Sequence, residues 1–183
     1  MRLPAHGGGF LDCILPQGGR GMEHVIWFSR TDAPEQSAAA RQLLARALGY
    51  MPRLAYGAHG KPFLPEEPER QISLAHTRGA VACAVSSRPV GVDIESCARR
   101  VNMRVAERSF TPRERAYAVD AARFLKVWTR KEAFVKRDGR GFTLPLNTVE
   151  TCGRTDIATY MEQGYVISVC GQAADFVLRT VTL

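Results

Sequence analysis

The segment VGVDIE, residues 90–95, alternates aliphatic residues with glycine or acidic residues. A period of two is typical of a β-strand, in which successive side chains leave opposite faces. The aliphatic residues would then share one face, and Asp93 and Glu95 would share the other with Gly91. At the ~3.3 Å rise per residue of a strand, the Cα atoms of Asp93 and Glu95 would lie about 7 Å apart. The segment therefore predicts a strand that offers two carboxylates on one face.

Two such carboxylates can hold a single cation between them. Oxygen ligands without cysteine or histidine suit a hard ion, and Mg²⁺ commonly takes one or two protein carboxylates together with phosphate oxygens. The same pair also fits the solvated face of an edge strand. Asp93 and Glu95 alone leave both interpretations open.

A helix predicted over residues 121–137 brings further polar groups. Trp128, Glu132 and Lys136 are four residues apart and stand in one column, with Lys131 beside it. An ordinary exposed Glu-to-Lys pair has the same spacing. Combined with the strand carboxylates, however, the column describes a site for a divalent ion that holds a pyrophosphate.

The other segments mix helix and strand signals, which predicts an α+β fold. A helix is predicted over residues 32–48, where Asp32 can cap the start, and another begins at Thr111, where Glu114 completes a capping box. Strands are predicted over residues 80–86, 147–152, 165–170 and 176–183, a loop over 56–69, and a loose lead-in or edge strand over 1–21.

The composition predicts a folded chain, and its net charge favours an anionic partner. Of 183 residues, 45% are hydrophobic and 23% are charged, as in globular proteins. No apolar run approaches the roughly 20 residues of a membrane-spanning helix, and the start does not resemble a signal peptide, so we expect a cytoplasmic protein without a membrane partner. The five cysteines form no C-x-x-C pair, which argues against a disulfide framework or a zinc site. A net charge of +7 favours nucleic acid, a phosphorylated ligand or an acidic protein.

Two of these segments together resemble the paired signature of the 4'-phosphopantetheinyl transferases. GVDIE at residues 91–95 matches G-[VI]-D, and WTRKEAFVK at residues 128–136 matches W-[ST]-x-K-E-A-x-x-K. GKP at residues 60–62 resembles a third family motif, and SLAHT at residues 73–77 resembles its N-[LI]-S-H-[ST] segment. The resemblance covers residues 41–146 and concerns in particular the surfactin-synthetase-type branch and its short bacterial members.

The resemblance implies an enzyme, a holo-acyl-carrier-protein synthase. It would transfer the 4'-phosphopantetheine group of coenzyme A to a serine of an apo acyl or peptidyl carrier protein, with Mg²⁺ as cofactor. It also implies a monomer of two similar α+β halves packed as a pseudo-dimer. Residues 1–88 would supply coenzyme A phosphate contacts, and residues 89–183 the metal site and catalytic helix.

The same resemblance assigns roles to individual side chains. Asp93, Glu95 and Glu132 would hold Mg²⁺. Glu132, or a metal-bound water that it orients, would act as the base, and Lys136 would neutralise the pyrophosphate. Contacts to coenzyme A are implied for Arg41, Lys61, His76, Thr77, Lys131 and Lys136.

Some positions leave this assignment open. Ser73 and Ala75 stand where the family has asparagine and serine, so a hydroxyl that helps hold the nucleotide is missing at Ala75. Glu114 lies near a family glutamate that approaches the metal, but the capping box alone also explains it. Taken alone, His76 fits a structural or surface residue.

Arginines are concentrated just after the acidic strand. Three of them, Arg100, Arg104 and Arg108, are one helical turn apart. We interpret them as a stripe that docks an acidic carrier protein, and a solvated face is the alternative. The full set is Arg99, Arg100, Arg104, Arg108, Arg113 and Arg115.

Two other functions fit parts of the sequence. A Mg²⁺-dependent nuclease or phosphodiesterase could use D-x-E and E-x-x-x-K on a basic chain, but it needs neither the GKP loop nor the Trp128 motif. A non-catalytic carrier-binding relative would fit the change at Ala75. We therefore expect no nucleic-acid partner, and the pathway stays open among fatty acid, polyketide and nonribosomal peptide synthesis.

Overall fold

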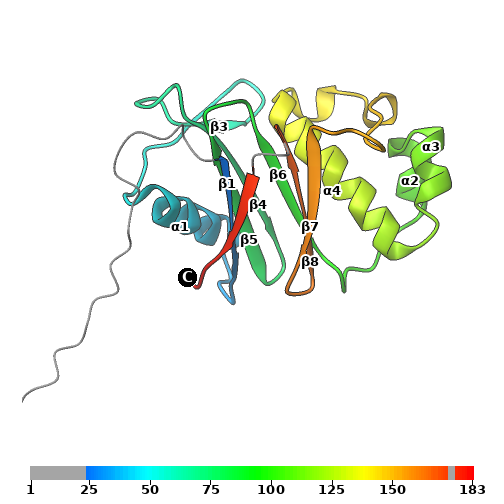
Figure 1. Ribbon diagram of the computed structural model, residues 1–183, viewed down its shortest axis with the longest axis horizontal. Coiled ribbons are helices and arrows are strands. Elements are labelled where there is room, and N and C mark those ends of the chain that lie inside the picture. The colour runs from blue at the N-terminus through cyan, green and yellow to red at the C-terminus, as the bar shows by residue number, and fades with distance from the viewer. Residues whose placement is uncertain (1–23, 173–175) are drawn as a thin grey trace, which may run out of the picture.

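Two sheets pack face to face with a helix on each outer side (Figure 1). The computed structural model describes residues 24–172 and 176–183. The predicted lead-in over residues 1–21 lies outside the described residues. The mixture of helices and strands confirms the α+β class.

The first sheet has the strand order β4-β5-β1-β9. Strand β1 is antiparallel to β5 and parallel to β9, so the end of the chain completes a sheet made mostly from its beginning. Helix α1 covers the outer face through buried alanine and leucine side chains. The bounds are β1 His24–Arg30, α1 Gln36–Leu48, β4 Gln71–Thr77, β5 Ala80–Ser86 and β9 Phe176–Thr180, and a small hairpin pairs β2 Ala55–Tyr56 with β3 Pro62–Phe63.

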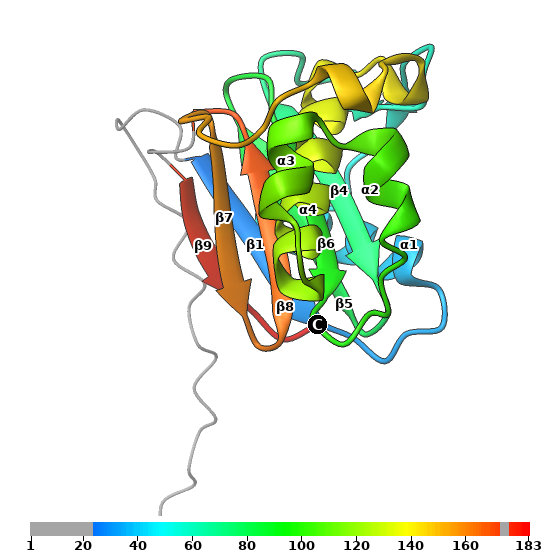
Figure 2. The same cartoon turned by 90° about the vertical axis from the view of Figure 1, so that its right-hand side faces the viewer.

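The second sheet is antiparallel, with the order β6-β8-β7. Helix α4 lies across its outer face, and α2 and α3 lie in front of α4 in Figure 2. The bounds are β6 Gly91–Ser96, α2 Arg104–Ser109, α3 Pro112–Tyr117, α4 Ala121–Asp138, β7 Ile157–Glu162 and β8 Tyr165–Cys170, with 3-10 turns η1 Gly141–Thr143 and η2 Leu146–Thr148.

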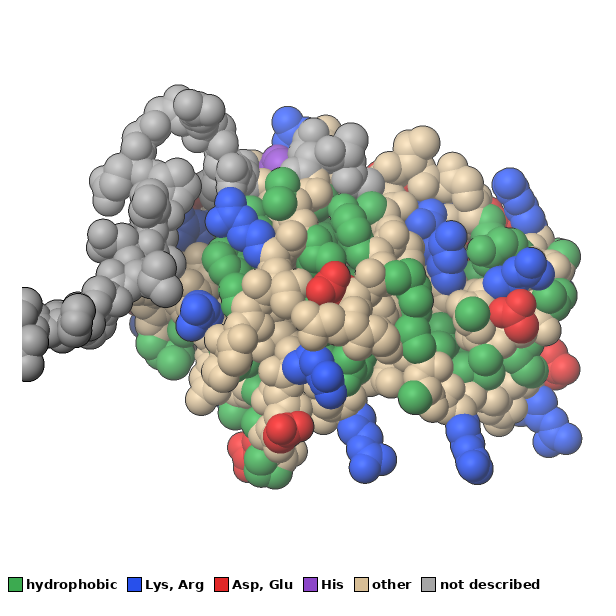
Figure 3. Space-filling view, turned by 60° about the horizontal axis from the view of Figure 1, so that its bottom comes forward, with side chains coloured by type: hydrophobic (Ala, Val, Ile, Leu, Met, Phe, Trp, Pro, Cys, Tyr) green, Lys and Arg blue, Asp and Glu red, His purple; other side chains and the backbone are tan. Residues whose placement is uncertain are grey.

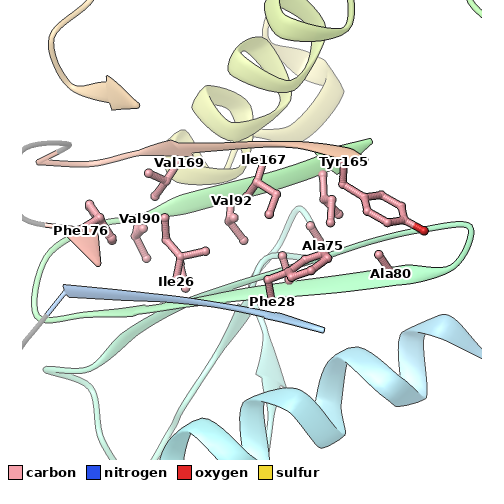
Figure 4. Packing of buried hydrophobic residues seen from close by; sticks show 13 residues of the cluster. Ile26, Phe28, Ala75, Ala80, Val90, Val92, Tyr165, Ile167, Val169 and Phe176 are labelled. Atoms are coloured by element: carbon pink, nitrogen blue, oxygen red, sulfur yellow. The ribbon is translucent and has the colours of Figure 1, made fainter. Parts of the chain in front are cut away.

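The main core fills the space between the two sheets. Figure 4 shows Ile26 and Phe28 of β1 pointing toward Val92 of β6 and Ile167 of β8. All four side chains are 0% exposed. The aliphatic face of the VGVDIE segment is therefore the face that packs on the first sheet, which leaves the acidic face toward α4.

Several predicted elements are confirmed, one predicted strand is wrong, and the predicted loop over residues 56–69 includes most of the β2–β3 hairpin. Strands β5, β6 and β8 and helices α3 and α4 lie where the sequence places them, while α1 begins four residues after Asp32. Residues 147–152 were expected to form a strand, but they contain part of η2 and irregular backbone. Backbone groups of this segment bond to the buried side chains of Lys131 and Glu114, and these contacts take the place of a strand ladder.

The predicted boundary at residues 88/89 lies in the turn between β5 and β6. It separates the sheet under α1 from the sheet under α4, except for β9. Strand β9 crosses back to pair with β1, so backbone hydrogen bonds join the two predicted halves.

Candidate active site

Gly91 sets the distance between the acidic strand and helix α4. A Cβ atom added at Gly91 would lie 2.0 Å from the carbonyl oxygen of Ala133 and 2.3 Å from the backbone nitrogen of Arg137. Both atoms belong to the helix backbone, so only glycine fits at this crossing. The close approach brings Asp93, two residues further along β6, under α4.

Asp93 forms an ion pair with Lys136 of α4. The Nζ atom of Lys136 lies 2.7 Å from Oδ1 of Asp93 and donates a hydrogen bond to it. Asp93 is only 8% exposed. Burial raises the pKa of Asp93, and the positive charge of Lys136 opposes this rise.

Glu132 lies one helical turn before Lys136 and shares its side of α4. Burial raises the pKa of Glu132, and the negative charge of Asp93 raises it further. Lys136 and Arg99 act in the opposite direction. The negative charges of Glu132 and Asp93 thus oppose each other, and a divalent cation bound by both would relieve that repulsion.

Glu95 is held by groups from two other segments. Its Oε1 atom pairs with the guanidinium of Arg99. Its Oε2 atom accepts a hydrogen bond from Oγ1 of Thr77 at 3.1 Å. Because Thr77 ends β4, this contact links the first sheet to the acidic strand.

The oxygen ligands of Asp93, Glu95 and Glu132 suit Mg²⁺, but the three carboxylates are not grouped around one point in this structure. Among the residues described, no group of three or more Asp, Glu, His or Cys side chains is placed to hold a metal ion. Asp93 and Glu95 are each neutralised by a basic side chain instead. An ion bound by these carboxylates would compete with Lys136 and Arg99 for the same negative charges.

Lys131 does not face this site. Its side chain is 0% exposed, and its Nζ atom lies 2.7 Å from Oε2 of Glu114. The same ammonium donates hydrogen bonds to the carbonyl oxygens of Leu146 and Val149 at 2.7 and 2.5 Å. Lys131 thus has a structural role in the interior, and its predicted contact with coenzyme A would require it to leave these partners.

Glu114 acts as a cap and as the partner of Lys131. Its Oε2 atom accepts from the backbone N–H of Thr111 at 2.8 Å, which completes the capping box of α3. Its Oε1 atom accepts from the backbone N–H and hydroxyl of Thr151 at 2.8 and 2.6 Å. These contacts confirm the capping interpretation of Glu114.

The other predicted coenzyme A contacts lie on several segments of the first half. Lys61 donates from Nζ to the carbonyl oxygens of Arg137 and Val90 at 2.8 and 3.3 Å, and burial lowers its pKa. Arg41 is exposed on α1 and donates to the hydroxyl of Tyr56 at 3.1 Å. His76 is exposed beside Thr77 at the end of β4.

Lys61 also lines a pocket of about 280 Å³ beside the GKP loop. This hollow lies between the loop, β4 and the end of α4. Its other lining residues are Gly57, Pro62, Phe63, Arg70, Gln71, Ile72 and Gly139.

Comparison with known proteins shows which family the chain belongs to. A family model described as the 4'-phosphopantetheinyl transferase superfamily matches residues 89–180. The chain belongs to this superfamily. The match covers β6, α4 and both motif segments that surround Asp93 and Glu132.

Individual transferases of the superfamily are similar over most of this chain. A 4'-phosphopantetheinyl transferase of Bacillus subtilis is 30% identical over 74% of this chain and 71% of its own length. The 4'-phosphopantetheinyl transferase Sfp of Bacillus subtilis strain 168 is 28% identical, over 68% of this chain and 65% of its own length. The 4'-phosphopantetheinyl transferase AcpT of Salmonella typhi is 33% identical, with 70% and 66% covered.

Two departures of this superfamily member from the motif lie in or beside the core. Ser73 is buried, and its hydroxyl accepts a hydrogen bond from the backbone N–H of Val92 at 3.0 Å, which ties β4 to β6. Ala75 is 1% exposed within the core between the sheets. A hydroxyl at Ala75 would therefore enter an apolar environment.

Sequence reasoning missed Arg99 as a member of the site. It was grouped with the basic stripe, whereas the structure pairs it with Glu95. The four-residue spacing of Glu95 and Arg99 was visible, but it predicts a contact only in a helix, and these residues lie at and beyond the end of a strand.

Proposed function

We propose that this protein transfers the 4'-phosphopantetheine group of coenzyme A to a serine of an apo acyl or peptidyl carrier protein. The observation that carries the proposal is the contact of Lys136 with Asp93 at 2.7 Å, with Glu132 one turn earlier on the same side of α4, in a member of this superfamily. Asp93, Glu95 and Glu132 would hold Mg²⁺. When bound, the ion would neutralise the diphosphate and so favour attack on it.

The chain's own residues account for the proton and the leaving charge. The hydroxyl oxygen of the carrier serine forms a bond to the β-phosphorus, and the bond from that phosphorus to the bridging oxygen breaks. Glu132 is the carboxylate proposed to accept the serine proton, directly or through a water. The ammonium of Lys136 stabilises the charge on the departing 3',5'-adenosine bisphosphate.

Substrate binding is proposed for the first half of the chain. Arg41, Lys61, His76 and Thr77 would contact coenzyme A. For Lys61, this requires its ammonium to reach from the carbonyl oxygens of Arg137 and Val90 toward a phosphate. We further propose a cytoplasmic monomer with no nucleic-acid or membrane partner. None of the described helices is long and apolar enough to cross a bilayer.

Detection of the covalent product tests this function. We expect a panel of apo carrier proteins, incubated with the protein, coenzyme A and Mg²⁺, to include carriers that gain the mass of one phosphopantetheine group. Carrier binding at unchanged carrier mass would favour the non-catalytic alternative. Cleavage of DNA or RNA with Mg²⁺, without any mass gain, would favour the nuclease alternative.

The docking of the carrier is proposed to use Arg104 and Arg108. Both side chains are exposed on α2, whereas Arg100 precedes this helix. Basic side chains on the face shown in Figure 3 are spread among apolar, uncharged and acidic ones. Arg104 and Arg108 would each pair with an acidic group of the carrier. An acidic carrier would gain from such pairs mainly in its rate of association.

Reversal of both charges tests this docking surface. The double variant Arg104→Glu/Arg108→Glu should raise the KM for the carrier by about tenfold, since two attractive contacts become repulsive. The affinity for coenzyme A should stay unchanged. Arg46→Glu, an exposed change on α1, is the matched control. An unchanged carrier KM in the double variant would exclude docking on α2.

A further inference from the structure

A second pocket lies between α3, α4 and the segment that follows η2. Its volume is about 350 Å³, which is within the range of small-molecule sites. Arg130 lines this pocket, and Glu132 belongs to the candidate active site. Two positions along a helix correspond to about 200° around its axis, so α4 separates the two sites.

The wall of this pocket is held in place by the guanidinium of Arg130. Its Nη2 atom donates to the carbonyl oxygens of Thr151 and Arg154 at 2.8 and 3.2 Å, and its Nη1 atom donates to that of Ile157 at 2.8 Å. These acceptors are neutral. In the part of the chain that the structure describes, the hydrogen bonds of this guanidinium go to neutral oxygens, while the carboxylate of Asp156 acts on it only through its charge.

Two more cations line the same hollow. The guanidinium of Arg113 lies against Gly153, where an added Cβ atom would be 3.6 Å from Nη2. Lys126 lies one turn before Arg130 on α4 and is exposed, and its ammonium has no ion pair within the described ranges. Val127 contributes an apolar surface between them. Three basic groups therefore surround a partly apolar hollow.

Glu150, an acidic group near Arg113, is already engaged in hydrogen bonds. Burial raises the pKa of Glu150, but hydrogen bonds from Thr111 and Cys152, together with the charge of Arg113, lower it overall. Its two carboxylate oxygens accept from the hydroxyl of Thr111 at 2.6 Å and from the backbone N–H of Cys152 at 2.7 Å. Glu150 thus supports the loop, and the described residues that line the pocket include three basic side chains and no acidic one.

We propose that this pocket binds a small organic anion. Its phosphate or carboxylate group lies between Arg113 and Lys126, and its apolar part lies against Val127 and Tyr117. Paired basic groups beside an apolar wall favour such a ligand because charge-assisted hydrogen bonds strengthen where water is partly excluded. The site is independent of the proposed transfer reaction.

Titration with phenyl phosphate, followed by NMR of the ¹⁵N-labelled protein at constant ionic strength, tests this site. We expect saturable shifts of the amide signals of Cys152 and Gly153. Arg113→Gln and Lys126→Gln should each weaken binding by about tenfold, as expected for the loss of one charge-assisted contact. Arg46→Gln on α1 should leave the affinity unchanged, and benzoate in place of phenyl phosphate tells whether a carboxylate is also accepted.

Several results would overturn the proposal. Shifts that do not saturate, or an equal loss of affinity in Arg46→Gln, would show general attraction to a basic surface. Equal affinity for inorganic phosphate and phenyl phosphate would show that the apolar part of the ligand makes no favourable contact in the pocket. Unchanged affinity in both pocket variants, with the remaining NMR spectrum intact, would place the anion elsewhere.

Discussion

Glu132→Gln should lower the rate of phosphopantetheine transfer by a factor of about 10²–10⁴, the range typical of loss of a general base. The substitution preserves size but removes the oxygen charge that accepts the serine proton and would bind the ion. It also removes the repulsion that raises the pKa of Glu132 next to Asp93. Stability should therefore be unchanged or slightly higher. The measurement is kcat from the mass gain of the carrier at saturating Mg²⁺, with a melting curve for each protein.

A glutamate outside the site provides the comparison for this variant. Glu69 is exposed in the loop before β4, so Glu69→Gln should keep the wild-type kcat. If Glu132→Gln retained a kcat within twofold of wild type at an unchanged melting temperature, Glu132 would be neither base nor essential ligand.

Glu114→Gln should reduce the free energy of unfolding by about 3–5 kcal/mol, as expected when one member of a buried ion pair is neutralised. Lys131 and Glu114 are both 0% exposed, so the remaining ammonium would stay buried without a counter-charge. Glutamine has one acceptor oxygen instead of two, so it cannot accept from both Thr111 and Thr151, and the loss combines the missing charge with a missing hydrogen bond. Urea unfolding at neutral pH measures the effect.

Two further variants separate charge from shape at this pair. The double variant Glu114→Gln/Lys131→Met should recover part of the loss because no buried charge remains. Arg53→Gln removes an exposed pair with Glu66, whose side chains are 79% and 74% exposed, and should cost at most about 1 kcal/mol. A wild-type free energy of unfolding for Glu114→Gln would contradict the assigned role of the buried pair.

The sequence was most informative where the signal is local. The capping box at Thr111 and the end of α4 at Gly139 depend on neighbouring residues, and both are confirmed. Strands β1 and β4 were missed because their burial follows from pairing with β5. The parallel pairing of β9 with β1 joins opposite ends of the described chain, and no local pattern predicts it.

The same distinction applies to the candidate site. Helical periodicity correctly placed Glu132 and Lys136 on one side of α4. Lys131 is adjacent to Glu132 in sequence, but one residue turns a helix by about 100°, and this turns Lys131 into the interior. Motif spacing identified the residue types, whereas burial on each side of the helix decided which charge faces the candidate site and which lies in the interior.

The close contact of Gly91 with the backbone of α4 sets how near the carboxylates of strand β6 lie to those of the helix. A larger residue at position 91 would push the helix away from the strand. The carboxylates of strand and helix would then move apart although none of them had been substituted. Conversely, a ligand bound by both Asp93 and Glu132 would hold helix α4 against the sheet. Binding of that ligand would therefore stabilise this half of the molecule.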